Sequence, residues 1–112
     1  MKTSSLLNNV IYNEDKPSIN VLFETETTKE IRIVMKKDQV MKKHQTPFPI
    51  VVEIFEGDLD FGIEGTIHHL NRGDMLALDG SIPHDLHANT NCIVRLTLAK
   101  SDTVQRVKKV VQ

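Results

Sequence analysis

Hydrophobic and polar residues alternate in short segments between Pro49 and Leu98, and glycines interrupt these segments about every eight residues. After the first glycine, for example, Leu59, Phe61 and Ile63 alternate with acidic residues and a glycine. A period of two is that of a half-buried β-strand, and the glycines fall where the chain would turn. Evenly spaced short strands predict an antiparallel all-β sandwich or barrel. The glycines that set this rhythm are Gly57, Gly65, Gly73 and Gly80.

The same patterning extends upstream and divides the chain into a series of predicted strands. Pro47-Phe48-Pro49 must interrupt the ladder, because neither proline can donate an amide hydrogen bond. In Asp102–Val111 the valines recur at helical spacing, which favours a short C-terminal helix. Because valine is a poor helix former, a frayed tail and a further strand are the alternatives there. The predicted strands are Ile19–Thr25, Ile31–Met35, Val40–Thr46, Ile50–Phe55, 58–64, Thr66–Asn71, Met75–Leu78, Asp85–Ala88 and Cys92–Ala99.

Strand parity also predicts which side chains form the core. One face of each strand carries the larger apolar residues, and a slip of one residue at a bulge would exchange the two faces. The expected core consists of Ile33, Met35, Ile50, Val52, Ile54, Leu59, Phe61, Ile63, Leu76, Leu78, Leu86, Val94, Leu96 and Leu98.

Composition excludes several classes of function. The chain has 112 residues and a formal net charge of -1, so it presents no field that would attract nucleic acid or an anionic membrane. It contains no tryptophan and one tyrosine, which argues against base-stacking platforms. Cys92 is the only cysteine, so an intrachain disulfide is excluded, and its apolar neighbours indicate an inert buried thiol. No signal-peptide pattern follows Lys2 and no apolar run is long enough to span a bilayer, so we expect a cytoplasmic protein.

Histidines carry most of the candidate chemistry. His44 precedes the Pro47–Pro49 break and His84 follows Pro83, so both lie where a strand meets a loop. Loops at the open end of a barrel are where barrels hold ligands. The alternative to a ligand-binding role is a structural one, in which both rings are polar groups in the barrel mouth, hydrogen-bonded to backbone or water. His68 and His69 are adjacent on one strand, so they point to opposite faces and cannot chelate as a pair.

Two motifs in this chain resemble those of the cupin superfamily, whose members are double-stranded β-helix barrels of the jelly-roll type. The first motif has the form G-x5-H-x-H-x(3,4)-E-x6-G, and counting back from Gly57 places His44 at its first histidine. The second has the form G-x5-P-x-G-x2-H-x3-N, and counting on from Gly73 places His84 at its histidine. The resemblance implies one cupin-like domain over residues 1–112, with a barrel core at about 30–99. At the remaining motif positions stand Thr46 for the second histidine, Ile50 for the glutamate, Asp79 for the proline, Ser81 for the second glycine and Ala88 for the asparagine.

These departures weaken the metal site that the resemblance implies. In metal-dependent cupins three histidines and a glutamate hold a divalent ion such as Zn, Ni, Fe or Mn. This chain keeps His44 and His84 as metal candidates, while Thr46 is a poor ligand and Ile50 is none. A complete metal site would need a further ligand from outside the two motifs' metal positions, such as Gln45, Asp85 or His87. Of these, His87 has the opposite strand parity to His84. The same four motif positions, His44, Thr46, Ile50 and His84, are the predicted ligand-binding residues.

Three functions from different classes remain open on the sequence. The first is binding of a small molecule in an apolar pocket near His44 and His84, with no metal required. The second is a cupin-type enzyme, such as a dioxygenase, isomerase or decarboxylase, that uses the same histidines. The third is an accessory sensor domain that acts through a partner protein. We also expect a homodimer, because the strands before the barrel expose edges, and Val51 and Phe55 lie on the outer face around Glu53.

Overall fold

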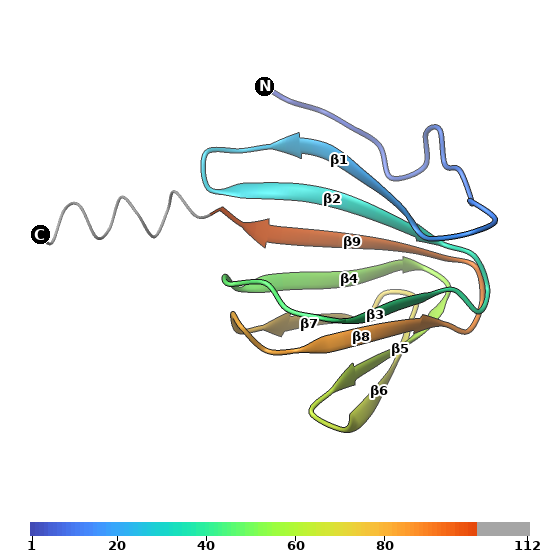
Figure 1. Cartoon of the computed structure of the whole chain (residues 1–112). Helices are drawn as coiled ribbons and strands as arrows, with labels where there is room; N and C mark the ends of the chain where they lie inside the picture. Colours follow the sequence, from blue (N-terminus) through green and yellow to red (C-terminus); the bar gives the residue numbers. More distant parts are fainter. Residues whose placement is uncertain (101–112) are drawn as a thin grey trace, which may run out of the picture.

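The computed structural model describes residues 1–100, whose regular structure consists of nine β-strands in two antiparallel sheets (Figure 1). The predicted C-terminal helix at Asp102–Val111 lies outside the described residues. Over residues 1–100 there is no helix long and apolar enough to cross a membrane. The strands are β1 (Ser18–Glu24), β2 (Thr28–Met35), β3 (Val40–His44), β4 (Ile50–Glu56), β5 (Asp58–Ile63), β6 (Thr66–Asn71), β7 (Met75–Leu78), β8 (His84–Ala88) and β9 (Cys92–Ala99).

The two sheets form a jelly roll. One sheet has the strand order β1-β2-β9-β4-β7 and the other has the order β3-β8-β5-β6. From β3 onward the chain crosses repeatedly between the sheets, so consecutive strands wrap around a shared interior. This arrangement confirms the predicted all-β, double-stranded β-helix fold.

Predicted and observed strand bounds agree closely in the C-terminal half. Thr66–Asn71, Met75–Leu78 and Cys92–Ala99 are strands as predicted. The main difference is at β2, which begins at Thr28 because the Thr25 amide donates to the Thr28 carbonyl (2.8 Å) and closes a tight turn. That turn is built from polar residues, so the apolar pattern placed the strand start too late.

Gly57 allows the sharp turn between β4 and β5. Its φ of 95° lies in the left-handed region that favours glycine. A side chain there would also collide with the Asn91 carbonyl and the Cys92 thiol, so the turn packs directly on the start of β9. The Cys92 side chain is buried, and burial raises the pKa of its thiol, as expected for an inert cysteine.

The core lies between the two sheets, on the faces that strand parity predicted. Ten of the predicted core residues are buried, and Ile63, Leu76, Leu96 and Leu98 are partly buried against them. Ile31, Ala88 and Cys92 join the same cluster. Ile31 shares the face of Ile33 and was omitted because it stands at the edge of the predicted strand.

The opposite face of β2 is also buried, which period-two patterning did not predict. The first residues of the chain cross the outside of the sheet near β1 and β2 (Figure 1). Arg32 fixes this segment, since its guanidinium donates to the carbonyls of Ser5, Leu6, Asn8 and Asn9. Val34 and Ile93 are buried on this same outer face. A second, smaller buried layer therefore lies outside the barrel.

Candidate functional site

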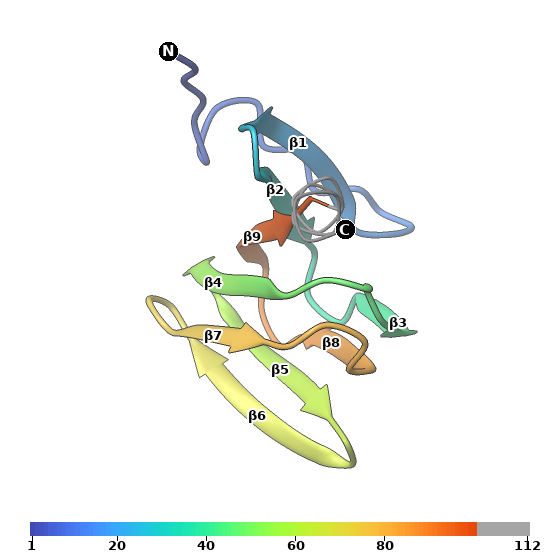
Figure 2. The same ribbon diagram turned by 90° about the vertical axis from the view of Figure 1, so that its left-hand side faces the viewer.

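One end of the barrel brings the ends of several strands together. β3 and β9 finish there, and β2, β4 and β8 begin there (Figure 1). Figure 2 looks onto this end, with β9 and β4 on one side of the opening and β3 and β8 on the other. We call this end the mouth.

His44 and His84 meet at the mouth. They are register partners where β3 pairs with β8, and their ring centroids lie 4.4 Å apart at an interplanar angle of 61°. His84 is buried, with 3% of its surface exposed, and stacks on Phe61 with ring centroids 5.3 Å apart. His44 is half-buried. The two histidines that the motifs singled out are thus in direct contact.

Backbone carbonyls orient both imidazole rings in the same way. Nδ1 of His44 lies 2.6 Å from the Lys42 carbonyl oxygen, and Nδ1 of His84 lies 2.9 Å from the Ile82 carbonyl oxygen. Because a carbonyl oxygen only accepts, each Nδ1 must carry the proton and donate it. A neutral ring held in this way keeps the Nε2 lone pair for a ligand or a proton. The alternative that both rings are hydrogen-bonded to the backbone is therefore correct for Nδ1. It assigns no partner to Nε2.

A small cavity lies beneath these rings inside the barrel. Its volume is about 40 Å³, which accommodates only a few water molecules at roughly 10–15 Å³ each. The predicted ligand-binding residues His44, Thr46, Ile50 and His84 all line it, so the structure does bring the four motif positions together. The other lining residues are Ile33, Met41, Val52, Phe61, Leu86, Val94 and Leu96.

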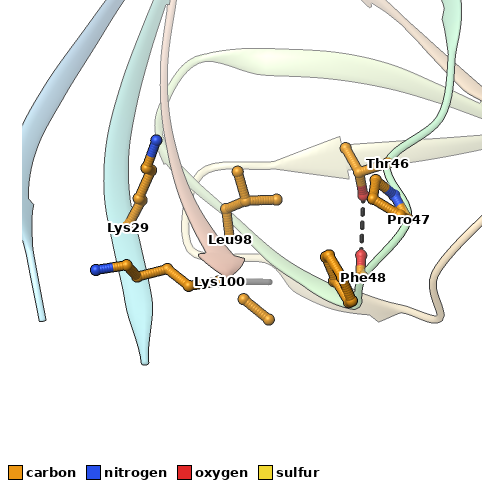
Figure 3. Close-up of a pocket in the computed structure, with 7 residues that line it drawn as sticks. Lys29, Thr46, Pro47, Phe48, Leu98 and Lys100 are labelled. Atoms are coloured by element: carbon orange, nitrogen blue, oxygen red, sulfur yellow. Dashed lines mark hydrogen bonds between the residues drawn. The ribbon is translucent and has the colours of Figure 1, made fainter. Parts of the chain in front are cut away.

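A larger hollow adjoins this cavity at the mouth. It has a volume of about 390 Å³, and Thr46 lines both spaces. Volumes of this size accept a small organic molecule. Figure 3 shows Pro47 and Phe48 on one side of the hollow and Lys29, Leu98 and Lys100 on the other. The hollow has room for a ligand larger than a few waters, and it meets the cavity that the histidines line at Thr46.

Local hydrogen bonds hold the loop between β3 and β4 at the edge of this hollow. The Thr46 hydroxyl donates to the Phe48 carbonyl (2.9 Å; Figure 3), and the Ser81 amide donates to the Thr46 carbonyl (2.6 Å). Gly80 packs so tightly against the Pro47 carbonyl that a side chain there would displace the loop. The loop that the prolines set apart from the ladder is thus positioned by the β7–β8 connection.

The donor set at the mouth does not complete a protein metal site. Among residues 1–100, no group of three histidine, cysteine, aspartate or glutamate side chains is placed to hold an ion. The Thr46 hydroxyl is already donating to a carbonyl, and Ile50 offers only hydrocarbon. Two imidazoles fall short of the three protein ligands of typical catalytic sites.

The residues that the sequence offered as a further metal ligand do not face the mouth histidines. Asp85 is exposed and packs against Gly62 on the outer face of β5. His87 is also on the outer face, where Nδ1 lies 3.0 Å from the Asn89 side-chain oxygen and Nε2 lies 3.6 Å from Asp38. Strand parity predicted this orientation of His87. Gln45 is exposed in the loop after β3.

His68 and His69 are both exposed, as predicted, and the second has acidic partners. His69 Nδ1 lies 2.7 Å from Asp60 and Nε2 lies 3.0 Å from Asp58. The hydrogen bond to Asp60, followed by the charge of Asp58, raises the pKa of His69. His69, Asp58 and Asp60 lie on the face of the sheet opposite the core residues Leu59 and Phe61.

On the β2 and β9 side of the hollow, sequence reasoning missed Lys29 and Lys100 and assigned Leu98 only to the core. Lys29 continues the inward-facing row of Ile31 and Ile33, so strand parity contained the signal once β2 is known to begin at Thr28. Phe48 was interpreted only as part of a break in the ladder. Its role as a wall depends on the packing of Gly80 against Pro47, which no local pattern reveals.

Comparison with protein-family models finds no match, and no curated protein is similar in sequence. Solved structures are similar in fold. An RmlC-like cupin protein from Desulfovibrio desulfuricans has a TM-score of 0.81 and 25% identity, over 88% of this chain and 96% of that one. A protein with a double-stranded β-helix domain from Klebsiella pneumoniae has a TM-score of 0.79 and 16% identity, over 90% and 92%. KdgF from a Halomonas species has a TM-score of 0.70 and 16% identity, over 81% and 87%.

Proposed function

This chain belongs to the cupin superfamily, and from its mouth geometry we propose that it binds a small organic molecule between His44, Thr46 and Phe48. The observation that carries the proposal is the pair of imidazoles whose Nδ1 atoms are both fixed by backbone carbonyls. Two Nε2 atoms are thereby kept for a ligand next to a hollow of about 390 Å³.

Fixed rings favour binding because little side-chain entropy is lost when a ligand arrives. His84 is held by its stacking on Phe61 and by the Ile82 carbonyl, and His44 is held against His84. The apolar side chains of Phe48 and Leu98 supply surface that a ligand can cover. The site thus combines a rigid polar end with an apolar wall.

Proton transfer at the same pair is the second candidate function. A neutral imidazole with Nδ1 donating to a carbonyl can accept a proton at Nε2, as a general base does. The ring that accepts a proton at Nε2 becomes an imidazolium, and it can then return that proton to another atom of the same substrate. Binding is the primary proposal because it needs only the contacts described above.

The binding proposal is tested with benzamide and benzoate as probes, using ligand-observed saturation-transfer NMR on the full chain. We expect wild type to bind at least one probe. His44→Gln should weaken the binding of benzamide, whose amide group can donate to the His44 Nε2, about fivefold, the effect of losing one hydrogen bond of ~1 kcal/mol. His84→Gln removes the buried ring that His44 contacts, and dispersed amide signals verify that this variant remains folded.

His87→Gln is the matched control, because His87 lies on the same strand as His84 and faces outward. It should bind the probes as wild type does. The proposal is wrong if neither probe binds wild type, or if His44→Gln and His87→Gln bind equally well.

A further inference from the structure

We propose that the mouth hollow selects small organic anions, with Lys29 providing the positive charge and Phe48 and Leu98 covering an apolar body. This inference rests on the proposed binding function and assigns its ligand class. It follows from three features of the hollow, namely the placement of its lysines, their partners and the character of its walls.

The lysines continue inward-facing rows of the sheet. In β2 the inner face presents Ile33 and Ile31 in the core and then Lys29 at the mouth. In β9 it presents Leu96 and Leu98, and Lys100 follows in the same row. An apolar row that changes to lysine at its last position places a cation at the rim of the barrel, with its methylene stem against the apolar wall.

The two lysines differ in their partners. Lys100 donates to the Thr25 carbonyl (2.9 Å) and lies 3.4 Å from the Glu24 carboxylate. Among the described residues none accepts a hydrogen bond from the Lys29 ammonium or forms an ion pair with it, in contrast to Lys100. Glu24 is the cross-strand partner of Lys29, yet its carboxylate pairs with Lys100. Together these three side chains leave a net charge of +1, located at Lys29.

Among residues 1–100, the rest of the lining of the hollow carries no compensating charge. It consists of Thr46, Pro47, Phe48, Leu98 and Ala99, and none of these is acidic. An uncompensated ammonium beside an apolar wall attracts a ligand that has a negative group at one end and hydrocarbon at the other. A carboxylate and a phosphate monoester both meet this description.

The test compares benzoate and phenyl phosphate with benzamide, which has a similar shape and no charge. Amide chemical shifts of Phe48 and Leu98 are followed in two-dimensional NMR titrations of the full chain at low ionic strength. We expect wild type to bind at least one of the two anions about fivefold more tightly than benzamide, the size of one partly exposed charge interaction. In Lys29→Gln this preference should disappear while benzamide affinity is unchanged.

Lys37→Gln is the matched control, since Lys37 follows β2 at the opposite end of that strand and is exposed. It should keep the preference for anions. Equal affinity of wild type for all three probes, or an unchanged preference in Lys29→Gln, would overturn the anion proposal and leave mouth binding intact. If no probe shifts the Phe48 and Leu98 amides, both the anion proposal and the proposed function fail.

Discussion

At the scale of single residues, the pair formed by His69 and Asp60 makes the stability of the fold depend on pH. The hydrogen bond to Asp60 raises the pKa of His69 above 6.5, and the same bond lowers the pKa of Asp60 below 3.8. The imidazolium contribution is complete below pH 6.5 and is lost as pH rises through the raised pKa, whereas the carboxylate contribution is lost as pH falls through the lowered one. We therefore predict that His69→Gln lowers the thermal midpoint most between about pH 4 and pH 6.5. Circular dichroism melts at pH 5.5 and pH 9 measure this, with the exposed neighbour variant His68→Gln as control. An equal effect of His69→Gln at both pH values would contradict it.

At the scale of elements, Arg32 supplies the side-chain hydrogen bonds from β2 to the N-terminal segment, and Lys36 and Gln39 bind the same segment just after β2. Arg32 is 5% exposed and all its described acceptors are neutral, namely four backbone carbonyls and the Asn20 side chain. Arg32→Met should release the segment and lower the free energy of unfolding by about 2 kcal/mol, because hydrogen bonds from a buried charged donor are lost. Urea denaturation gives the loss, and chymotrypsin cleavage at Tyr12 reports the release. Arg72→Met is the control, since Arg72 is exposed and pairs weakly with Glu56 at 3.4 Å. Unchanged resistance of Tyr12 in Arg32→Met would show that other contacts hold the segment.

At the scale of the whole molecule, the unpaired edge of β1 supports the expected homodimer. No described strand pairs with this edge, and Ile19 and Val21 are 58% and 57% exposed on β1, with Val40 at 48% on β3. A second copy that pairs through β1 would cover these residues in a twofold arrangement. Val51 and Phe55 give less apolar surface than expected, because Val51 is 37% exposed and Phe55 is half-buried at a bulge. We predict a dimer by light scattering at micromolar concentration and a monomer for Ile19→Glu with Val21→Glu. Ile67→Glu, on β6 at an edge of the other sheet, should remain dimeric, and a monomeric wild type would refute the proposal.

Across the whole molecule, the sequence predicts most of the barrel but not its outer layer or the lining of the hollow. Most of the barrel follows from residues such as Leu59 and Phe61, whose alternation reflects one sheet face against the core. The outer layer over Val34 does not follow, because a strand buried on both faces loses its period of two. His44 and His84 could be paired from the motif spacing alone. Lys29 and Phe48 could not, since their places in the hollow depend on where β2 starts and on how the Gly80 turn packs.

The most direct test of binding at the mouth is a titration of the full chain, labelled with 13C in its histidines, with benzamide, whose amide group can donate to an imidazole Nε2. The chain has five histidines, and the structure places His44 and His84 at the mouth, His69 and His87 on outer faces, and His68 exposed on the edge strand β6. We predict that the ring signals of His44 and His84 move together with one saturable affinity, while those of His68, His69 and His87 stay in place. Movement of the outer histidines alone, or no movement at either mouth histidine, would contradict the proposed function.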